Sequence, residues 1–481
     1  MIQEFIMAFL PELVLLAGVL AVFVVTLYND RVARARAVSL ATAAALVVSC
    51  LITLRSEATL FDGAYRVDLF SQWLKLAFGV GYLAVILLGR RVDDIRPDIR
   101  PEFFLFLGIS MTGFVFLASS IDAITLVVSL ELSSFPLFLL VAMRREREGQ
   151  RMQMESAIKF MMFGVAANGV MLFGLSYLYG LTSTTSIPLM VQRLQPVIDG
   201  PLALAGLGLT FAGLYYKLAV FPFHFWTPDV YQGASNETAG IIASMPKLGA
   251  VVILVRFAAA ATPDNQLITE ILTVLAVASM FYGNLVALVQ RDLKRLLGFS
   301  TIAHAGYTLL GFVALDEAGF SASLYYMTGY LFMVLACFVV ISRVSRDGEN
   351  VAIEDLHGLH RRSPLLALTM VIGIFALAGI PPFVGFMGKF ALLNAAFARG
   401  HTVLVILAVI NTAIAAYYYL RVVHASFFGD RDATDQMPIA LDGSTRALCI
   451  GLIAIVILLG VTPAPVIDAI TTSLASVVAV P

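Results

Sequence analysis

Residues 215–249 read YYKLAVFPFHFWTPDVYQGASNETAGIIASMPKLG, a stretch that sets two lysines, a histidine and three prolines among apolar residues. Lys217 follows about sixteen uncharged residues, and Lys247 opens another apolar run. A cation at bilayer depth costs about 3 kcal/mol even on a lenient insertion scale, so each lysine is a candidate functional residue. Pro222 has no amide to donate to the carbonyl of Leu218, which predicts an interrupted helix just beyond Lys217. A charge beside an interrupted helix indicates an ion path.

The composition is that of an integral membrane protein. Of the 481 residues, 60% are hydrophobic and 13% are charged, against about 25% charged in a soluble domain. The formal net charge of -1 gives no indication of a nucleic-acid partner. Cys50, Cys337 and Cys449 stand singly in apolar runs, so we expect no redox centre from them.

The apolar runs predict an all-α polytopic membrane protein. Counting runs that can cross about 30 Å of hydrocarbon gives about fourteen helices. The seventh, near 201–233, is interrupted at Pro222, and the twelfth, near 363–398, is interrupted at Pro381 and Pro382. We therefore expect helices seven and twelve to be discontinuous.

Two segments indicate an internal repeat. KLAVFPFHFW at 217–226 and AGIPPFVGFMGKF at 378–390 each set proline and aromatic residues close to a lysine, five predicted helices apart. An odd offset reverses the direction through the membrane, which predicts inverted repeats of helices four to eight and nine to thirteen. The predicted domains are 1–100 with helices one to three, 101–262 with the first repeat, 263–428 with the second, and 429–481 with helix fourteen and the tail.

Loop charges predict the orientation. Basic residues gather in the odd-numbered connections, such as Arg34 and Arg36 in the first and Arg144 and Arg145 in the fifth. By the positive-inside rule these connections are cytoplasmic, so both termini are expected on the periplasmic side.

Glu131 is an acidic residue deep in an apolar run, and Pro136 follows it five residues later, as Pro222 follows Lys217. It could form a structural ion pair, or it could pair with Lys217 and modulate its proton affinity. At about 7 Å and an effective dielectric of about 20, such a charge shifts its partner by roughly 2 kcal/mol. Glu131 and Lys217 could then form a switchable proton site.

Other titratable residues extend this set. Lys389 lies beyond the second break, after Gly385 and Gly388, and His224 and His304 lie in apolar segments. Each lysine could instead be a structural cation bound by carbonyls, and each histidine a hydrogen-bonded core residue. A proton relay explains better why several cations stand at similar depth.

Two further lysines are weaker candidates. Lys159 follows Glu155 by four residues, which favours a helix-surface pair and leaves it a possible relay. Lys75 could snorkel to the membrane surface. His357 and His360 have no clear third ligand, so no metal is expected. No phosphate loop, paired-cysteine motif or nucleophile elbow is present, so ATP, iron-sulfur, flavin and hydrolase chemistry lack support.

Four motifs together carry a family resemblance: ELSSFPLFLL at 131–140, YYKLAVFPFHFWTPDVYQGA at 215–234, QRDLKRLLGFSTIAHAGY at 290–307 and AGIPPFVGFMGKF at 378–390. They resemble the antiporter-like membrane subunits of proton-pumping NADH:quinone oxidoreductase, respiratory complex I, over about residues 1–465. The N subunits are the most similar, because Lys389 stands where the M subunits have a glutamate.

The resemblance implies a role for each matching residue. Glu131 and Lys217 would form the charged pair of the first half-channel, Lys247 would connect the halves, Lys389 would serve the second half-channel, and His304 would lie between them. After YQGA the family reads Pro-Thr-Pro or similar, whereas this chain has Ser235, Asn236 and Glu237. Asn236 is expected to cap the eighth helix in place of the proline.

The resemblance also implies the setting. Proton translocation would be driven by electron transfer in other subunits, which would hold NADH, flavin, iron-sulfur clusters and quinone, with no cofactor in this chain. The partners would be the other membrane and peripheral subunits and the lipid of a bacterial inner membrane. Two alternatives remain open: a subunit of a multi-subunit cation/proton antiporter, and a scaffold subunit whose charges only fix helices.

Overall fold

The computed structural model describes residues 2–28, 31–89, 92–146, 152–428 and 437–478, which are almost entirely helical. The helices are α1 (Ile2–Ala8), α2 (Leu10–Thr26), α3 (Arg31–Ile52), α4 (Leu69–Leu88), α5 (Arg100–Ser119), α6 (Ala123–Ala142), α7 (Met152–Thr182), α8 (Ile187–Leu194), α9 (Pro201–Leu218), α10 (Trp226–Gly233), α11 (Asn236–Ala258), α12 (Gln266–Ala287), α13 (Leu293–Val313), α14 (Glu317–Val344), α15 (Leu359–Arg362), α16 (Pro364–Ala378), α17 (Val384–Ala398), α18 (Thr402–Phe428), α19 (Gly443–Val461) and α20 (Ala464–Val478). Strands β1 (Ala58–Leu60) and β2 (Tyr65–Val67) pair antiparallel, with Ala58 opposite Val67.

The predicted fold class is confirmed. Eleven of the described helices are long and apolar enough to cross a membrane. The 17-residue α2 and two interrupted helices, α9 with α10 and α16 with α17, supply the remaining crossings of the predicted set. Pro136 and Pro246, by contrast, lie inside the unbroken helices α6 and α11.

The two interruptions fall at the predicted prolines. The chain leaves helical geometry after Leu218 and resumes it at Trp226, with Pro222 between. It does so again between Ala378 and Val384, where Gly379 adopts a positive φ of 85° and its amide donates to the carbonyls of Phe375 and Ala376. Each interruption leaves further carbonyls at the end of a helix without an intrahelical donor.

The chain forms two compact units. The first comprises Met1–Leu214, Val252–Ala261 and Ile470–Pro481, and the second comprises Tyr215–Val251 and Thr262–Ala469. Lys217, Lys247, His304 and Lys389 therefore all belong to the second unit. The domain boundaries predicted at residues 100, 262 and 428 stay predictions.

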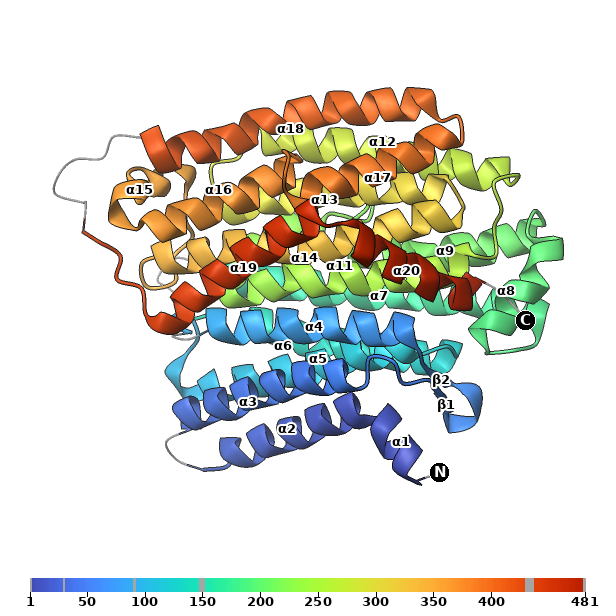
Figure 1. Ribbon diagram of the computed structural model, residues 1–481, viewed down its shortest axis with the longest axis horizontal. Helices are drawn as coiled ribbons and strands as arrows, with labels where there is room; N and C mark the ends of the chain where they lie inside the picture. The colour runs from blue at the N-terminus through green and yellow to red at the C-terminus, as the bar shows by residue number, and fades with distance from the viewer. Residues whose placement is uncertain (1, 29–30, 90–91, 147–151, 429–436, 479–481) are drawn as a thin grey trace. The chain divides into compact units, whose positions relative to one another are not determined.

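In the first unit, α2, α3 and α4 pack side by side in sequence order (Figure 1). The hairpin of β1 and β2 lies in the connection between α3 and α4, and Tyr65 and Val67 of β2 are buried in a small apolar cluster with Ala8 and Phe9. The hairpin thus seals one end of these helices.

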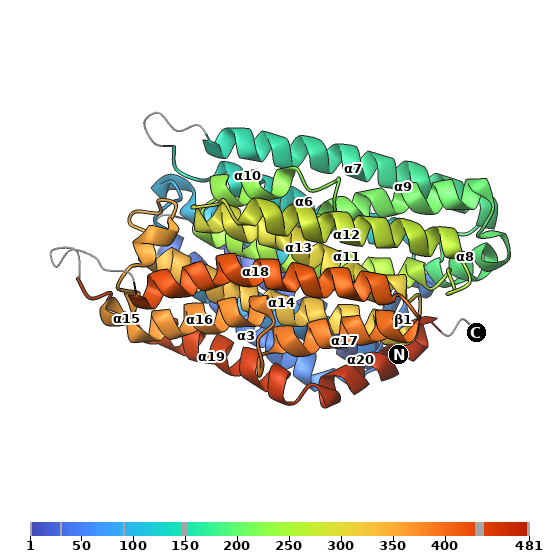
Figure 2. The same cartoon turned by 90° about the horizontal axis from the view of Figure 1, so that it is seen from above.

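In the second unit, the most apolar stretches of α13 and α14 are wholly buried, and the two helices pack on each other. α12 and α18 lie side by side on the outside, as both views show (Figure 2). Only 33% of the most apolar stretch of α18 is buried. The polar residues of α13 and α14 are therefore shielded from lipid by the helices around them.

Candidate functional site

Lys217 and Lys247 meet at the first helix interruption. Lys217 lies in the last turn of α9, and Lys247 lies inside α11 with no exposed surface. Lys247 Nζ donates to the backbone carbonyl of Lys217 at 3.0 Å. The end of α9 thus offers a backbone carbonyl to the neighbouring lysine.

Aromatic rings complete the surroundings of Lys247. Its Nζ lies 4.4 Å from the ring centroid of Trp226 and 6.0 Å from that of Tyr231. Trp226 is fixed by its own Nε1, which donates to the carbonyl of Tyr216 at 3.0 Å. A desolvated cation–π contact contributes about 2 kcal/mol. The ammonium of Lys247 thus lies between the end of α9 and the start of α10, without a carboxylate partner among the described residues.

Lys389 repeats this arrangement at the second interruption. Its Nζ donates to the carbonyls of Leu377 and Ala378, the last two residues of α16, at 3.0 and 3.1 Å. The same nitrogen lies 4.6 Å from the ring centroid of Tyr307. Both breaks therefore use helix-end carbonyls and an aromatic face to hold a buried ammonium.

A close approach of backbones positions Lys389. A Cβ atom on Gly385 would overlap the carbonyl oxygen of Ala376, and one on Gly388 would lie 2.6 Å from the ring of Tyr326. These glycines let α17 pack against the end of α16 and against α14. Glycine at these two positions therefore gives the room that this close backbone approach requires.

His304 lies in α13, is 2% exposed and contacts two hydroxyl groups. Its Nδ1 lies 2.5 Å from the hydroxyl of Tyr326 and its Nε2 lies 2.9 Å from that of Tyr419. Tyr419 in turn lies 2.6 Å from the hydroxyl of Ser300. A neutral imidazole donates through one nitrogen and accepts through the other, so it can take a proton on one side and release one on the other.

Hydroxyl groups and rings link this histidine to both lysines. Thr301 lies 2.8 Å from the hydroxyl of Tyr330 and donates to Tyr231 at 3.4 Å. The ring centroid of His304 lies 5.0 Å from that of Tyr330 and 6.3 Å from that of Tyr307. We call the resulting set the polar row: Lys247, Tyr231, Thr301, Tyr330, His304, Tyr326, Tyr419, Tyr307 and Lys389.

The sequence located the ends of the polar row but missed its tyrosines and threonine. Tyrosine is common in apolar helices, so it carries little signal by itself. Tyr326 and Tyr330 are four residues apart and so share one face of α14. Two tyrosines on one face of a helix, in a chain whose preceding helix contains a histidine, were the available signal.

His224 lies among aromatic rings between α9 and α10. Its ring centroid is 4.3 Å from that of Tyr282 and 5.3 Å from that of Phe221. Neither ring nitrogen has a hydrogen-bond partner among the described residues. Its possible relay role stays a prediction.

Glu131 and Lys159 belong to the first unit. The Glu131 carboxylate accepts a hydrogen bond from the Asn168 side chain of α7. Lys159 Nζ lies 2.6 Å from Glu155, and this pair is 36% and 65% exposed, as expected of a helix-surface salt bridge. The pairing of Glu131 with Lys217 would join residues of different units, and it stays a prediction.

Two local expectations were wrong. Lys75 does not snorkel: its side chain has no exposed surface and lies 2.6 Å from Glu12. Asn236 does not cap α11, which begins at that residue; the Ser235 hydroxyl accepts from the amide of Thr238 at 3.2 Å instead. Among the described residues, no group of three or more histidine, cysteine or acidic side chains could hold a metal ion.

Comparison with known proteins agrees with this arrangement. A family model described as NADH:quinone oxidoreductase/Mrp antiporter, TM, matches residues 120–415. The protein named NADH-quinone oxidoreductase subunit N 2 of Opitutus terrae is 63% identical over 470 residues, which cover 98% of each chain.

Two solved structures share the fold. A chain of respiratory complex I from Thermus thermophilus with bound aureothin superposes with a TM-score of 0.82 at 31% identity, covering 96% of this chain and 99% of that one. A chain of the Mrp complex from Dietzia sp. superposes with a TM-score of 0.88 at 18% identity, covering 100% and 98%, and shows similarity of fold alone. The match over more than half of the chain and the identity to the Opitutus relative show that the protein belongs to the NADH:quinone oxidoreductase/Mrp antiporter family of membrane subunits.

Proposed function

We propose that this chain is a proton-translocating membrane subunit of an NADH:quinone oxidoreductase, of the subunit N type, and that the polar row carries the protons. The observation that supports this most is the continuity of the row. From Lys247 to Lys389, hydrogen bonds join Tyr231, Thr301 and Tyr330, and the other steps are ring-to-ring or ammonium-to-ring separations of 4.6–6.3 Å within the second unit. The name of the Opitutus relative supplies the complex and the subunit.

The geometry supports a relay of short transfers. When a lysine ammonium loses a proton, an N–H bond breaks, and a water molecule or hydroxyl accepts that proton while releasing another. His304 can then accept at one ring nitrogen and release at the other, between the hydroxyls of Tyr326 and Tyr419. The helix-end carbonyls at Lys247 and Lys389 accept hydrogen bonds from either the ammonium or the amine, so each lysine keeps its position in both states.

The driving energy would enter from outside the chain. Electron transfer from NADH through flavin and iron-sulfur clusters to quinone would take place in other subunits of a complex in the bacterial plasma membrane. It would reach this chain as a change in charge or hydration that moves Glu131 relative to Lys217 and so shifts the proton affinity of that lysine. His224 and Lys159 are further possible relay groups, and both termini would be periplasmic.

Lys247→Ala tests the relay, because it removes the buried ammonium and leaves the carbonyl of Lys217 in place. We expect NADH-driven proton uptake by inverted membrane vesicles, normalised to assembled complex, to fall about tenfold or more, as is typical when a positioned proton-transfer group is removed. In a tightly coupled pump, quinone reduction should fall with it. Arg96→Gln alters an exposed pair with Asp98 and serves as the control. Normal proton uptake in Lys247→Ala would contradict the relay.

The same vesicles separate the alternatives. A cation/proton antiporter, which the fold of the Dietzia chain also fits, would keep NADH activity and lose sodium-driven proton movement in Lys247→Ala. A scaffold subunit would show less assembled complex with unchanged activity per complex.

A further inference from the structure

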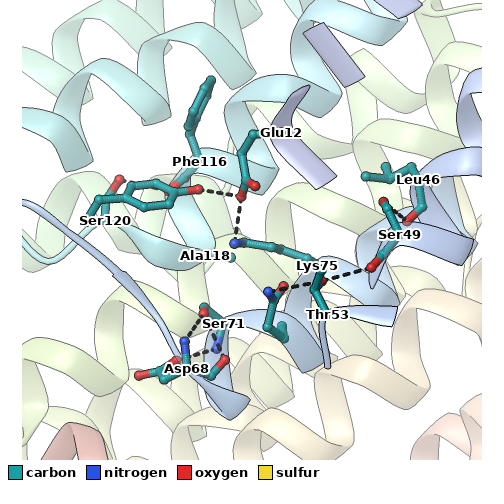
Figure 3. A network of polar contacts seen from close by, with 12 residues as sticks. Glu12, Leu46, Ser49, Thr53, Asp68, Ser71, Lys75, Phe116, Ala118 and Ser120 are labelled. Carbon is teal, nitrogen blue, oxygen red and sulfur yellow. Dashed lines mark hydrogen bonds and ion pairs between the residues drawn. The ribbon is translucent and has the colours of Figure 1, made fainter. Parts of the chain in front are cut away.

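A second buried charged cluster lies in the first unit, outside the polar row. Lys75 Nζ of α4 lies 2.6 Å from Oε1 of Glu12 of α2, and both side chains have no exposed surface (Figure 3). The hydroxyl of Tyr65, on strand β2, donates to the same carboxylate oxygen at 2.6 Å. Side chains from two other elements, α4 and β2, thus converge on one carboxylate oxygen of α2, and no role proposed above uses these three residues.

An ion pair whose only role was to hold two helices together would be energetically unfavourable at this buried position. Removing two charges from water costs more than their attraction returns, so a well-packed apolar pair of similar volume is usually at least as stable. Glu12 Oε2 also has no hydrogen-bond partner among the described residues. A buried carboxylate oxygen without a partner is unfavourable, and it is an available position for a proton or a water molecule.

Other buried polar atoms lie around the pair. Gln72, one turn before Lys75 on α4, donates to the hydroxyl of Thr53 at 3.2 Å, but its Oε1 has no partner among the described residues. Arg256, in the part of α11 that belongs to this unit, donates through Nη2 to the carbonyl of Ala118 at 2.5 Å. Its Nε and Nη1 have no such partner. Polar groups in this arrangement favour bound water, which commonly bridges buried atoms of this kind.

The charged and titratable groups that face the cluster come from four elements. Cys50 of α3 is within electrostatic range of Lys75 and Glu12. Arg256 of α11 is within electrostatic range of Tyr65, of Asp68 at the start of α4 and of Arg66 on β2. Asp68 and Arg66 are half-buried beside the hairpin. They connect the buried cluster to the end of the unit where the hairpin lies.

We propose that Glu12, Tyr65 and Lys75 form a proton-binding site, separate from the polar row, that exchanges one proton with water at the hairpin end of α2 and α4. In the empty state Glu12 is a carboxylate paired with the Lys75 ammonium. In the loaded state a hydronium ion has given a proton to Oε2, so an O–H bond has formed, a water molecule remains, and Lys75 is still an ammonium. Oε1 keeps its contacts with Lys75 and Tyr65 in both states, and Oε2, which has no hydrogen-bond partner among the described residues, takes up or releases the proton.

Tyr65 acts in this site as a positioning residue. Burial, followed by the negative charge of Glu12, raises the pKa of Tyr65 well above its ordinary value. The phenol therefore stays protonated and donates to Oε1 in both states, which leaves Oε2 for the exchanged proton.

Infrared difference spectra of the full chain in its native membrane test the site. Between about pH 7 and pH 3, a range that spans the ordinary titration of a glutamate carboxyl group, acidification should produce a carboxylic-acid C=O band. The band should shift in D2O and be absent in Glu12→Gln. If Glu12→Gln fails to accumulate, Glu12→Gln/Lys75→Met provides the band-free reference, because it leaves no unpaired buried ammonium.

The Tyr65→Phe variant distinguishes a proton-binding site from an ion pair that only holds α2 and α4 together. Losing a donor to the carboxylate disfavours its charged form, so the band should appear at a pH about one unit higher, a tenfold change in proton affinity. Tyr82→Phe, a buried tyrosine on α4 beside Ser39, is the matched control and should leave the band unchanged. A spectrum without any Glu12-dependent band, or a band that Tyr65→Phe does not move, would overturn the proposal. Because no electron transfer is needed, this result is independent of the Lys247→Ala outcome.

Discussion

Tyr419 is the residue at which the polar row is best tested by removing a single atom, because its hydroxyl contacts both His304 and Ser300. Tyr419→Phe leaves the buried Nε2 of His304 without this partner, at a cost of about 1–3 kcal/mol. We expect NADH-driven proton uptake to slow by about tenfold at normal assembly. Tyr417→Phe, on the same helix but 63% exposed, should leave it unchanged. Equal rates in the two variants would remove Tyr419 from the row.

At this scale the sequence is informative about charges and silent about their partners. Lys217, Lys247 and Lys389 are conspicuous because each interrupts an apolar run, and that signal is local. Lys75 carries the same signal, but its partner Glu12 lies more than sixty positions earlier, and only the folded structure brings the two side chains together. Snorkelling was therefore a reasonable expectation that tertiary structure overruled.

The interrupted helix α16–α17 depends on Gly385 as well as on its prolines. In Gly385→Ala, the added methyl group would overlap the carbonyl of Ala376 and push α17 away from the carbonyls that hold Lys389. Overpacking of this kind costs about 1–3 kcal/mol, so we expect a lower thermal midpoint of the detergent-solubilised protein.

Gly169→Ala is the matched control for this variant. Gly169 lies in α7 with open space around the added methyl group, and alanine favours helices by about 1 kcal/mol over glycine. An unchanged or raised midpoint is expected there. A Gly385→Ala protein as stable as the parent would show that α17 can shift without cost.

Elements were predicted well where the cause is local to the chain. Proline cannot donate a hydrogen bond, so the breaks at Pro222 and at Pro381 and Pro382 could be located from residue type alone. The cap of α11 is a counterexample: Ser235 and Asn236 are both suitable, and a shift of one residue decides which side chain reaches the Thr238 amide.

For the whole molecule, the orientation predicted from loop charges can be measured directly. Thr59→Cys lies in the second connection, predicted periplasmic, and Glu349→Cys lies in the eleventh, predicted cytoplasmic; both positions are exposed. The three natural cysteines are buried, so we expect little background labelling from them. A membrane-impermeant maleimide should label Thr59→Cys in intact cells and Glu349→Cys in inverted vesicles. The reverse pattern would place both termini in the cytoplasm.

The backbone acceptors of the lysine sites affect what a series of substitutions at these sites can measure. The acceptors for Lys247 and Lys389 are peptide carbonyls, which every amino acid supplies. No replacement of the side chain at position 217 deletes the oxygen that binds Lys247, so a substitution series there reports on the Lys217 ammonium alone. Substitutions that accumulate during evolution therefore leave these acceptor oxygens in place, as long as the helix ends themselves are kept.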